Sequence, residues 1–271
     1  MILPSGIPSR KKYEELLQSA LFHRIEKFSN NFILENNDVL IPFNRKWTQD
    51  PLHQWSRQWE YPFVFSKLQH MKRSTRVLDA GSGITFFPYL LSSSFKGTEI
   101  FCADKDELLI KIYRKISGPN HKGVKFSRTN LEQLSFPDKY FDAIYCISVL
   151  EHSKQVTNII NQFHRVLKRD GLLLLTFDIS LDGESEIPIK EVSELLAHIK
   201  RRFKVEKIQE NVLFSEKRIS KSITTHYIAQ FMPKLLPWRF PLLTKIRSVL
   251  KFHFSRSLYH NLTVCCVIAR K

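Results

Sequence analysis

The middle of the chain alternates short apolar runs with longer segments of mixed polarity. Five apolar runs of strand length follow one another from residue 76: "RVLDAG", "EIFCAD", "VKFSRTN", "FDAIYCIS" and "GLLLLTFDI". Residues 155–168 and 189–203 instead repeat apolar positions every three or four residues, which predicts amphipathic helices. Apolar strands that alternate with such helices are typical of an α/β fold, in which helices cover both faces of a parallel sheet.

The two ends of the chain carry other patterns. Residues 12–28 have helical spacing, and the aromatic-rich residues 40–70 are expected to form a loop followed by a helix. The run "FKVEKIQENV" from residue 203 is predicted to be a sixth strand, parallel to its neighbours, and "NLTVCCVIARK" from residue 261 a buried closing strand.

These patterns divide the chain into four parts. They are an N-terminal helical and aromatic segment, a core, a basic aromatic insertion and a closing strand, at residues 1–73, 74–214, 215–259 and 260–271.

The composition fits a folded cytoplasmic protein. Hydrophobic residues make up 43% of the 271 residues, enough for a sizeable core. We find no secretory signal in "MILPSGIPSRKK" and no apolar run near the roughly 18 residues of a spanning helix, so at most a membrane-surface attachment is expected. Cys102, Cys146, Cys265 and Cys266 lie in apolar runs without metal-type spacing, which predicts buried, reduced thiols.

Positive charge is concentrated near the C-terminus. The net charge is +16, and the last acidic residue is Glu216. Residues 217–271 contain eleven lysines and arginines and no acid. Such asymmetry indicates an anionic partner.

Two glycines follow the first apolar run at a spacing that suits a ligand turn. Gly81 and Gly83 come directly after Asp79, where a parallel strand would end. A dinucleotide fold has a third glycine in G-x-G-x-x-G, but Phe86 occupies that position here. A carboxylate beside the turn favours a ligand with an ammonium group and no pyrophosphate. Asp104, which ends the second run, is positioned to accept hydrogen bonds from a ribose diol.

With these motifs in order, the sequence resembles the class I S-adenosylmethionine-dependent methyltransferases, in particular the group whose fourth strand ends in Leu-Glu-His. The resemblance covers roughly residues 74–180 and rests on "VLDAGSG", "CAD", "TNLEQLSFPDKYFD", "VLEH" and "RVLKRDGLLLL". It implies a Rossmann-like sheet of seven mostly parallel strands with the last one antiparallel. An N-terminal helical lid and a basic insertion before the last strand are implied as well.

The resemblance also assigns cofactor-binding residues. Asp79, Gly81, Ser82 and Gly83 are expected at the methionine part, and Asp104 at the ribose. Asn130 and Leu131 are expected at the adenine, and Ile147 and Ser148 at the methyl side. Some relatives bind a divalent metal through Glu-x-x-Glu-His. Ser148 replaces the first of those glutamates here, which removes a hard anionic ligand, so no metal is expected.

Two residues after the apolar runs are catalytic candidates. His152 is a candidate general base, because imidazole exchanges protons near neutral pH. The alternative is that it packs against the cofactor or caps the next helix. Asp178 is the second candidate, although it could simply open the following loop.

The segment "HQWSRQWEY" before the first strand has two interpretations. Its aromatic residues and Arg57 could clamp a sugar or an anionic group. Alternatively, Trp55 and Trp59 lie four residues apart, share one helical face and pack on the core.

The predicted function is methyl transfer, through O-methylation, to a small-molecule, glycan or lipid-linked acceptor. An RNA or protein methyltransferase and a non-catalytic adaptor with the cofactor fold are the alternatives, and nucleic acid is the less favoured partner. Apolar residues interleaved with lysines and arginines in residues 217–258 predict a lid that contacts anionic membrane. A helical cap that buries those apolar residues is the alternative.

Overall fold

The computed structural model describes residues 3–44, 50–71, 74–116, 123–183, 185–206, 208, 214–236 and 260–271. Its helices, with short 3₁₀ turns marked η, are α1 (Arg10–Leu17), α2 (Ala20–Asn44), α3 (Arg57–Leu68), α4 (Phe87–Ser94), α5 (Leu108–Ile116), η2 (Leu150–His152), α6 (Val156–Val166), α7 (Ile189–Arg202), α9 (Glu216–Ile219), α10 (Thr225–Phe231) and η3 (Pro233–Leu235). Its strands are β1 (Arg76–Ala80), β2 (Glu99–Asp104), β3 (Val124–Arg128), β4 (Phe141–Ile147), β5 (Leu167–Ser180), β6 (Ile187–Pro188), β7 (Lys204–Val205) and β8 (Leu262–Arg270).

One mixed sheet organises the chain, and the predicted α/β fold is confirmed. The strand order is β3-β2-β1-β4-β5-β8-β7, and the short β6 pairs with β5 outside this path. Strands β1 to β5 pair in parallel, whereas β8 runs antiparallel to β5 along its whole length. The carboxyl ends of the parallel strands therefore meet at one edge.

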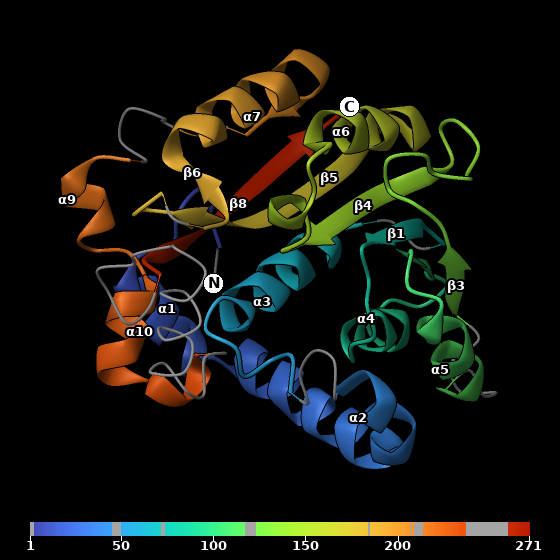
Figure 1. Cartoon of the computed structure of the whole chain (residues 1–271). Coiled ribbons are helices and arrows are strands. Elements are labelled where there is room, and N and C mark those ends of the chain that lie inside the picture. Colours follow the sequence, from blue (N-terminus) through green and yellow to red (C-terminus); the bar gives the residue numbers. More distant parts are fainter. Residues whose placement is uncertain are drawn as a thin grey trace, which may run out of the picture.

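Helices cover both faces of the sheet. Figure 1 shows α6 and α7 on one face and α2, α3, α4 and α5 on the other. Side chains alternate accordingly: in β1, Val77 joins the core beneath α4 and Leu78 the core beneath α6. The same alternation places Cys266 in the first core and Cys265 in the second, and all four cysteines are buried, as predicted.

The predicted helix over residues 12–28 is two helices. Helix α1 ends at Leu17 and α2 begins at Ala20. The Ser19 hydroxyl accepts a hydrogen bond from the Phe22 amide at 3.1 Å, as a residue at the start of a helix does. A serine cap inside an apolar repeat therefore breaks the helix, and α2 continues through the start of the expected loop to Asn44.

The sixth strand differs from its prediction. Within the described residues, β7 spans only Lys204–Val205, and it pairs antiparallel with β8. Strand β7 therefore runs in the same direction as β5, as predicted, but its neighbour is the antiparallel closing strand, which inserts between β5 and β7. Residues 207 and 209–213 lie outside the described residues.

The described start of the insertion packs on the fold. Ile223, Ile228 and Leu236 are buried in the core on the α1 side of the sheet, whereas the Phe231 side chain is 59% exposed. The helical-cap interpretation therefore holds for this part. Residues 237–259, with Lys245, Arg247 and Lys251, lie outside the described residues. Among the described residues, no helix has both the length and the apolarity to cross a membrane.

Candidate functional site

A cavity of about 1130 Å³ opens at the carboxyl edge of the parallel strands. The predicted residues that line it are Gly81, Ser82, Gly83, Asp104, Asn130, Leu131, Ile147, Ser148 and His152. Phe43, Pro51, Gln54 and Arg57 line it from the N-terminal segment. A small-molecule site usually measures about 300–1,000 Å³, so this cavity is slightly larger than the usual range.

The glycine turn is shaped as a cradle for a ligand. Gly81 and Gly83 have positive φ angles of 78° and 50°, which glycine adopts without strain. A Cβ atom on Gly81 would lie 2.5 Å from Cγ2 of Val149. The Gly81 amide donates to the Ala103 carbonyl at 2.8 Å, so β2 holds the turn in place.

Asp104 joins the turn to the ribose side of the cavity. Its Oδ2 accepts a hydrogen bond from the Gly83 amide at 2.9 Å, and its Oδ1 accepts one from the Asp106 amide at 3.0 Å. Each carboxylate oxygen has a second lone pair, so both remain able to accept from a diol. On the adenine side, Asn130 is exposed, with its Oδ1 accepting from the Glu132 amide at 3.1 Å, and Leu131 is buried.

Asp79 lies behind the cavity wall. It is 6% exposed at the end of β1 and does not line the cavity. Burial, opposed by the Tyr145 phenol and aided by the nearby Asp104 charge, raises the pKa of its carboxyl to about 8. A ligand ammonium group beside Asp79 would favour the ionised form.

A buried polar triangle closes the methyl side of the cavity. Ser148 follows β4 with a φ of 46°, and its hydroxyl donates to Oε1 of Glu60 at 2.8 Å. Nη1 of Arg57 donates to both Ser148 and Glu60. Glu60 is fully buried, so Arg57 supplies the positive charge that a buried carboxylate needs.

The two catalytic candidates occupy different positions. His152 lines the cavity with a side chain that is 61% exposed, and its Nδ1 lies 3.6 Å from Oε2 of Glu186. Asp178 does not line the cavity, and its backbone amide donates to Oε1 of Glu151 at 3.3 Å. Burial, and then the charge of Glu151, raises the pKa of the Asp178 carboxyl well above its ordinary value.

Glu151 and Asp178 form a buried acidic pair. Oε2 of Glu151 and Oδ1 of Asp178 have no hydrogen-bond partner in the part of the chain that the structure describes. Burial raises the pKa of Glu151 to about 8. Both shifts favour the protonated carboxyl, which limits Asp178 as a base.

The aromatic segment serves two purposes. Trp55 and Trp59 are 3% and 0% exposed, so they pack on the core as the second interpretation predicted. Arg57 and Glu60 were not predicted as a pair that supports the cavity wall. The sequence feature that could have indicated this pair is the spacing of three residues between an arginine and a glutamate in a helix rich in aromatic residues.

No metal centre is evident in the described parts of the chain, where no three His, Cys, Asp or Glu side chains group closely enough to hold an ion.

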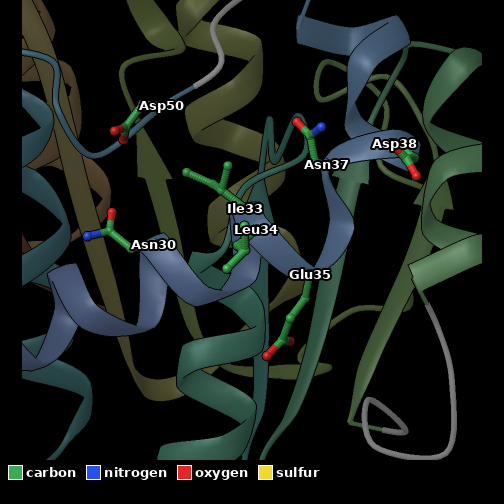
Figure 2. Close-up of a pocket in the computed structure, with 7 residues that line it drawn as sticks. All are labelled: Asn30, Ile33, Leu34, Glu35, Asn37, Asp38 and Asp50. Carbon is green, nitrogen blue, oxygen red and sulfur yellow. The ribbon is translucent and has the colours of Figure 1, made fainter.

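A second cavity, of about 550 Å³, lies along α2 (Figure 2). It is lined by Asn30, Ile33, Leu34, Glu35, Asn37, Asp38 and Asp50. This cavity is separate from the strand ends and holds none of the predicted site residues.

The residues at the strand ends fit S-adenosylmethionine. The glycine cradle admits close approach of a ligand, and a carboxylate ends each of the first two strands. The cavity reaches from Asn130, expected at the adenine, to Ser148, expected at the methyl side.

Comparisons with known proteins identify a methyltransferase domain in the core of the chain. A family described as "Methyltransferase domain" matches residues 78–175. The uncharacterized methyltransferase YcgJ of Bacillus subtilis is 30% identical over 117 residues, which cover 40% of this chain and 43% of that protein. The sterol 24-C-methyltransferase ERG6A of Gibberella zeae is 25% identical over 197 residues, 66% of this chain and 48% of that protein.

The fold is shared with solved structures. The crystal structure of the Bacillus YcgJ protein covers 78% of this chain and 97% of its own, with 17% identity and a TM-score of 0.52. The matched part of this chain spans less than half the length of the two curated relatives, 43% and 48%. With the domain match and the strand order in agreement, residues 78–175 form a methyltransferase domain of the class I fold, whose cofactor is S-adenosylmethionine.

Proposed function

We propose that this protein catalyses the transfer of a methyl group from S-adenosylmethionine to a hydroxyl of a small-molecule, glycan or lipid-linked acceptor. The observation that carries the proposal is the position of His152. It lines the same cavity as Ile147 and Ser148, and a carboxylate lies 3.6 Å from its Nδ1. A histidine oriented by a carboxylate can accept a proton at its other nitrogen.

The proposed step uses few groups of this chain. S-adenosylmethionine supplies an electrophilic methyl group whose carbon–sulfur bond breaks as the new carbon–oxygen bond forms. His152 Nε2 takes the proton of the acceptor hydroxyl, while the Glu186 carboxylate, 3.6 Å from Nδ1, stabilises the imidazolium electrostatically. The cavity walls keep the two reactants in line, which lowers the entropic cost of their encounter.

The acceptor side is polar, which supports a hydroxylated acceptor. Arg57, Ser148 and His152 line it, with the Glu60 carboxylate directly behind. The curated relatives include a sterol methyltransferase, and a demethylmenaquinone methyltransferase of Deinococcus radiodurans also matches, which supports a small molecule as acceptor. Buried charges disfavour an acceptor that is apolar at its reacting end.

Two features of the chain outside the core are part of the proposal. Phe43, Pro51 and Gln54 reach the cavity from the N-terminal segment, which supports a lid over the cofactor.

The basic insertion supports peripheral contact with anionic membrane, where each basic residue adds about 1 kcal/mol of binding free energy. Flotation with liposomes of graded anionic content tests the second feature. Equal binding to neutral and anionic vesicles would leave the insertion as a cap alone.

The test of the proposed function is a methyl-transfer screen. Labelled S-adenosylmethionine is incubated with cell extract separated into small-molecule, lipid, glycan, RNA and protein fractions. Label in the lipid, glycan or small-molecule fractions supports the proposal. Label in RNA or protein alone would favour the alternative enzymes, and no transfer to any fraction would favour a non-catalytic adaptor.

The role of His152 is tested with the acceptor that the screen identifies. His152→Ala is expected to lower turnover by about a hundredfold or more, with cofactor affinity unchanged. His70→Ala is the matched control, because His70 is exposed and does not line the cavity. Unchanged turnover in His152→Ala would remove the general base from the proposal.

A further inference from the structure

His53 joins the turn before α3 to the first half of α2 through two carboxylates. Its Nδ1 lies 2.6 Å from Oδ2 of Asp50 in the same turn, and its Nε2 lies 3.0 Å from Oε1 of Glu26 in α2. Neutral imidazole has only one N–H to donate, whereas imidazolium has two. With a carboxylate at each ring nitrogen, His53 is therefore held as a cation. We call these two contacts the His53 bridge.

The surrounding charges keep the ring of His53 protonated. The hydrogen bond to Asp50 is the largest influence; burial opposes it and the hydrogen bond to Glu26 adds to it, so the pKa of His53 is raised to about 9. Asp50 and Glu26 are the charged groups that act on His53 within the described residues. His23 lies 3.7 Å from the other oxygen of Glu26, but it belongs to α2 itself. Of the two histidines beside Glu26, His53 is the one that connects separate segments.

The turn around His53 forms part of the wall of the cavity at the strand ends. Pro51 and Gln54 line that cavity, and residues 50–56 form neither a helix nor a strand. Leu52 is buried and anchors the turn to the core. Because the turn has no regular structure of its own, its position against α2 depends on side chains, and His53 supplies such a contact.

Close packing does not replace the His53 bridge next to Asp50. The second cavity lies between the turn and the helix there: Asp50 lines it from the turn, and Asn30 and Ile33 line it from α2 (Figure 2). Glu26 precedes Asn30 by one helical turn, so the bridge spans the two segments beside this gap. Asp50 also accepts a hydrogen bond from the backbone amide of His53 at 3.2 Å, which ties the bridge to the backbone of the turn.

We propose that His53 is a positioning residue that holds the wall of residues 50–54 against α2 and thereby slows the release of the bound cofactor. The inference rests on the lid of the proposed function and identifies a contact that keeps this lid in place. A bridge of this kind needs a cation between two anions, so loss of the imidazole or of its proton should loosen the wall. His53 does not line the cavity, so it acts on the time that the ligand stays bound rather than on the chemical step.

Surface plasmon resonance with S-adenosylhomocysteine, the cofactor without its methyl group, measures the release rate. At pH 7, His53→Ala is expected to release this ligand about fivefold faster than the wild type or more, as the loss of two partly exposed ion pairs predicts. His23→Ala is the matched control, because His23 pairs with the same Glu26 but links no second segment, and it should leave the rate unchanged. His53→Arg keeps a cation with donors for two carboxylates and should restore slow release.

The pH dependence of release separates the charge of His53 from its packing. With a pKa raised to about 9, the wild-type imidazolium loses its proton above that pH and the bridge is lost, whereas an arginine stays charged. The ratio of the wild-type release rate to the His53→Arg rate should therefore rise between about pH 8 and about pH 10. Other titrations, including that of Asp79, occur in both proteins and cancel in this ratio.

Four results would overturn the proposal: release from His53→Ala at the wild-type rate, equally fast release from His53→Arg, equally fast release from His23→Ala, or a flat ratio across the pH range. The last comparison does not need His53→Ala, so it decides the matter even if that variant does not fold. A wild-type protein that does not bind S-adenosylhomocysteine would refute the cofactor site itself, and the bridge with it. Failure of the methyl-transfer screen, in contrast, would leave the release rates and their interpretation intact.

Discussion

The contact between Gly81 and Val149 makes the Gly81→Ala variant a test of how tightly the cofactor turn is built. A Cβ on Gly81 would lie 2.5 Å from Cγ2 and 2.7 Å from Cγ1 of Val149, so side chain or backbone must move. Overpacking of this kind costs about 1–3 kcal/mol. The φ angle of 78° adds about 1–2 kcal/mol for a residue with a side chain. We expect Gly81→Ala to lower the free energy of unfolding by about 2–5 kcal/mol.

The chain offers a control that separates these two costs. Gly183 has a φ angle of 75°, but no described atom lies within 4 Å of its Cβ position. Gly183→Ala should therefore carry the backbone cost alone, about 1–2 kcal/mol. Adding Val149→Ala to Gly81→Ala should recover the overpacking part and leave the backbone part.

Urea unfolding followed by circular dichroism measures the three variants and the wild type. The expected order of stability is wild type, then Gly183→Ala, with Gly81→Ala lowest. If Gly81→Ala is as stable as Gly183→Ala, the side chain of Val149 does not restrict the turn. The packing argument would then be wrong, although the fold would stand.

Two further results are expected from buried carboxyl groups. Asp104→Ala should weaken cofactor binding about tenfold or more in calorimetry, because each hydrogen bond to a charged group contributes about 1.5–3 kcal/mol; binding within twofold of wild type would refute the ribose assignment. Asp79 and Glu151, both with a pKa raised to about 8 by burial, hold protons in the folded state that the unfolded state releases above about pH 4. Their contribution to stability is full below that pH and is lost as the pH rises toward 8, so unfolding midpoints should fall over this range, and Asp79→Asn should flatten the fall.

The strand ends were predictable from sequence because they depend on local order. Each apolar run ends in a short polar segment. Parallel pairing brings those ends to one edge of the sheet, however the helices pack against its faces. The positions of Gly81, Asp104 and His152 at the cavity follow from this rule alone. The division of residues between the two faces, as at Cys265 and Cys266, follows from strand alternation in the same way.

The residues that were not predicted depend on contacts between distant parts of the chain. Ser148 meets Glu60 and Arg57 across 88 and 91 residues, and only the packing of α3 against β4 determines that meeting. Asp178 ends a strand at the expected edge, yet sequence does not reveal on which side of the cavity wall its carboxyl lies. The direction of β7 relative to its neighbour likewise follows from the insertion of a strand that comes more than fifty residues later.

The four buried thiols give the protein an internal chemical reporter. Cys102 in β2, Cys146 in β4, and Cys265 and Cys266 in β8 all have side chains without measurable solvent exposure. A thiol reagent can reach them only when the sheet opens, so the labelling rate in native buffer measures that opening directly. Mass spectrometry would resolve none to four added labels per molecule. Labels gained together would show a sheet that opens as a unit, and labels gained first in β8 would show that the closing strand separates alone.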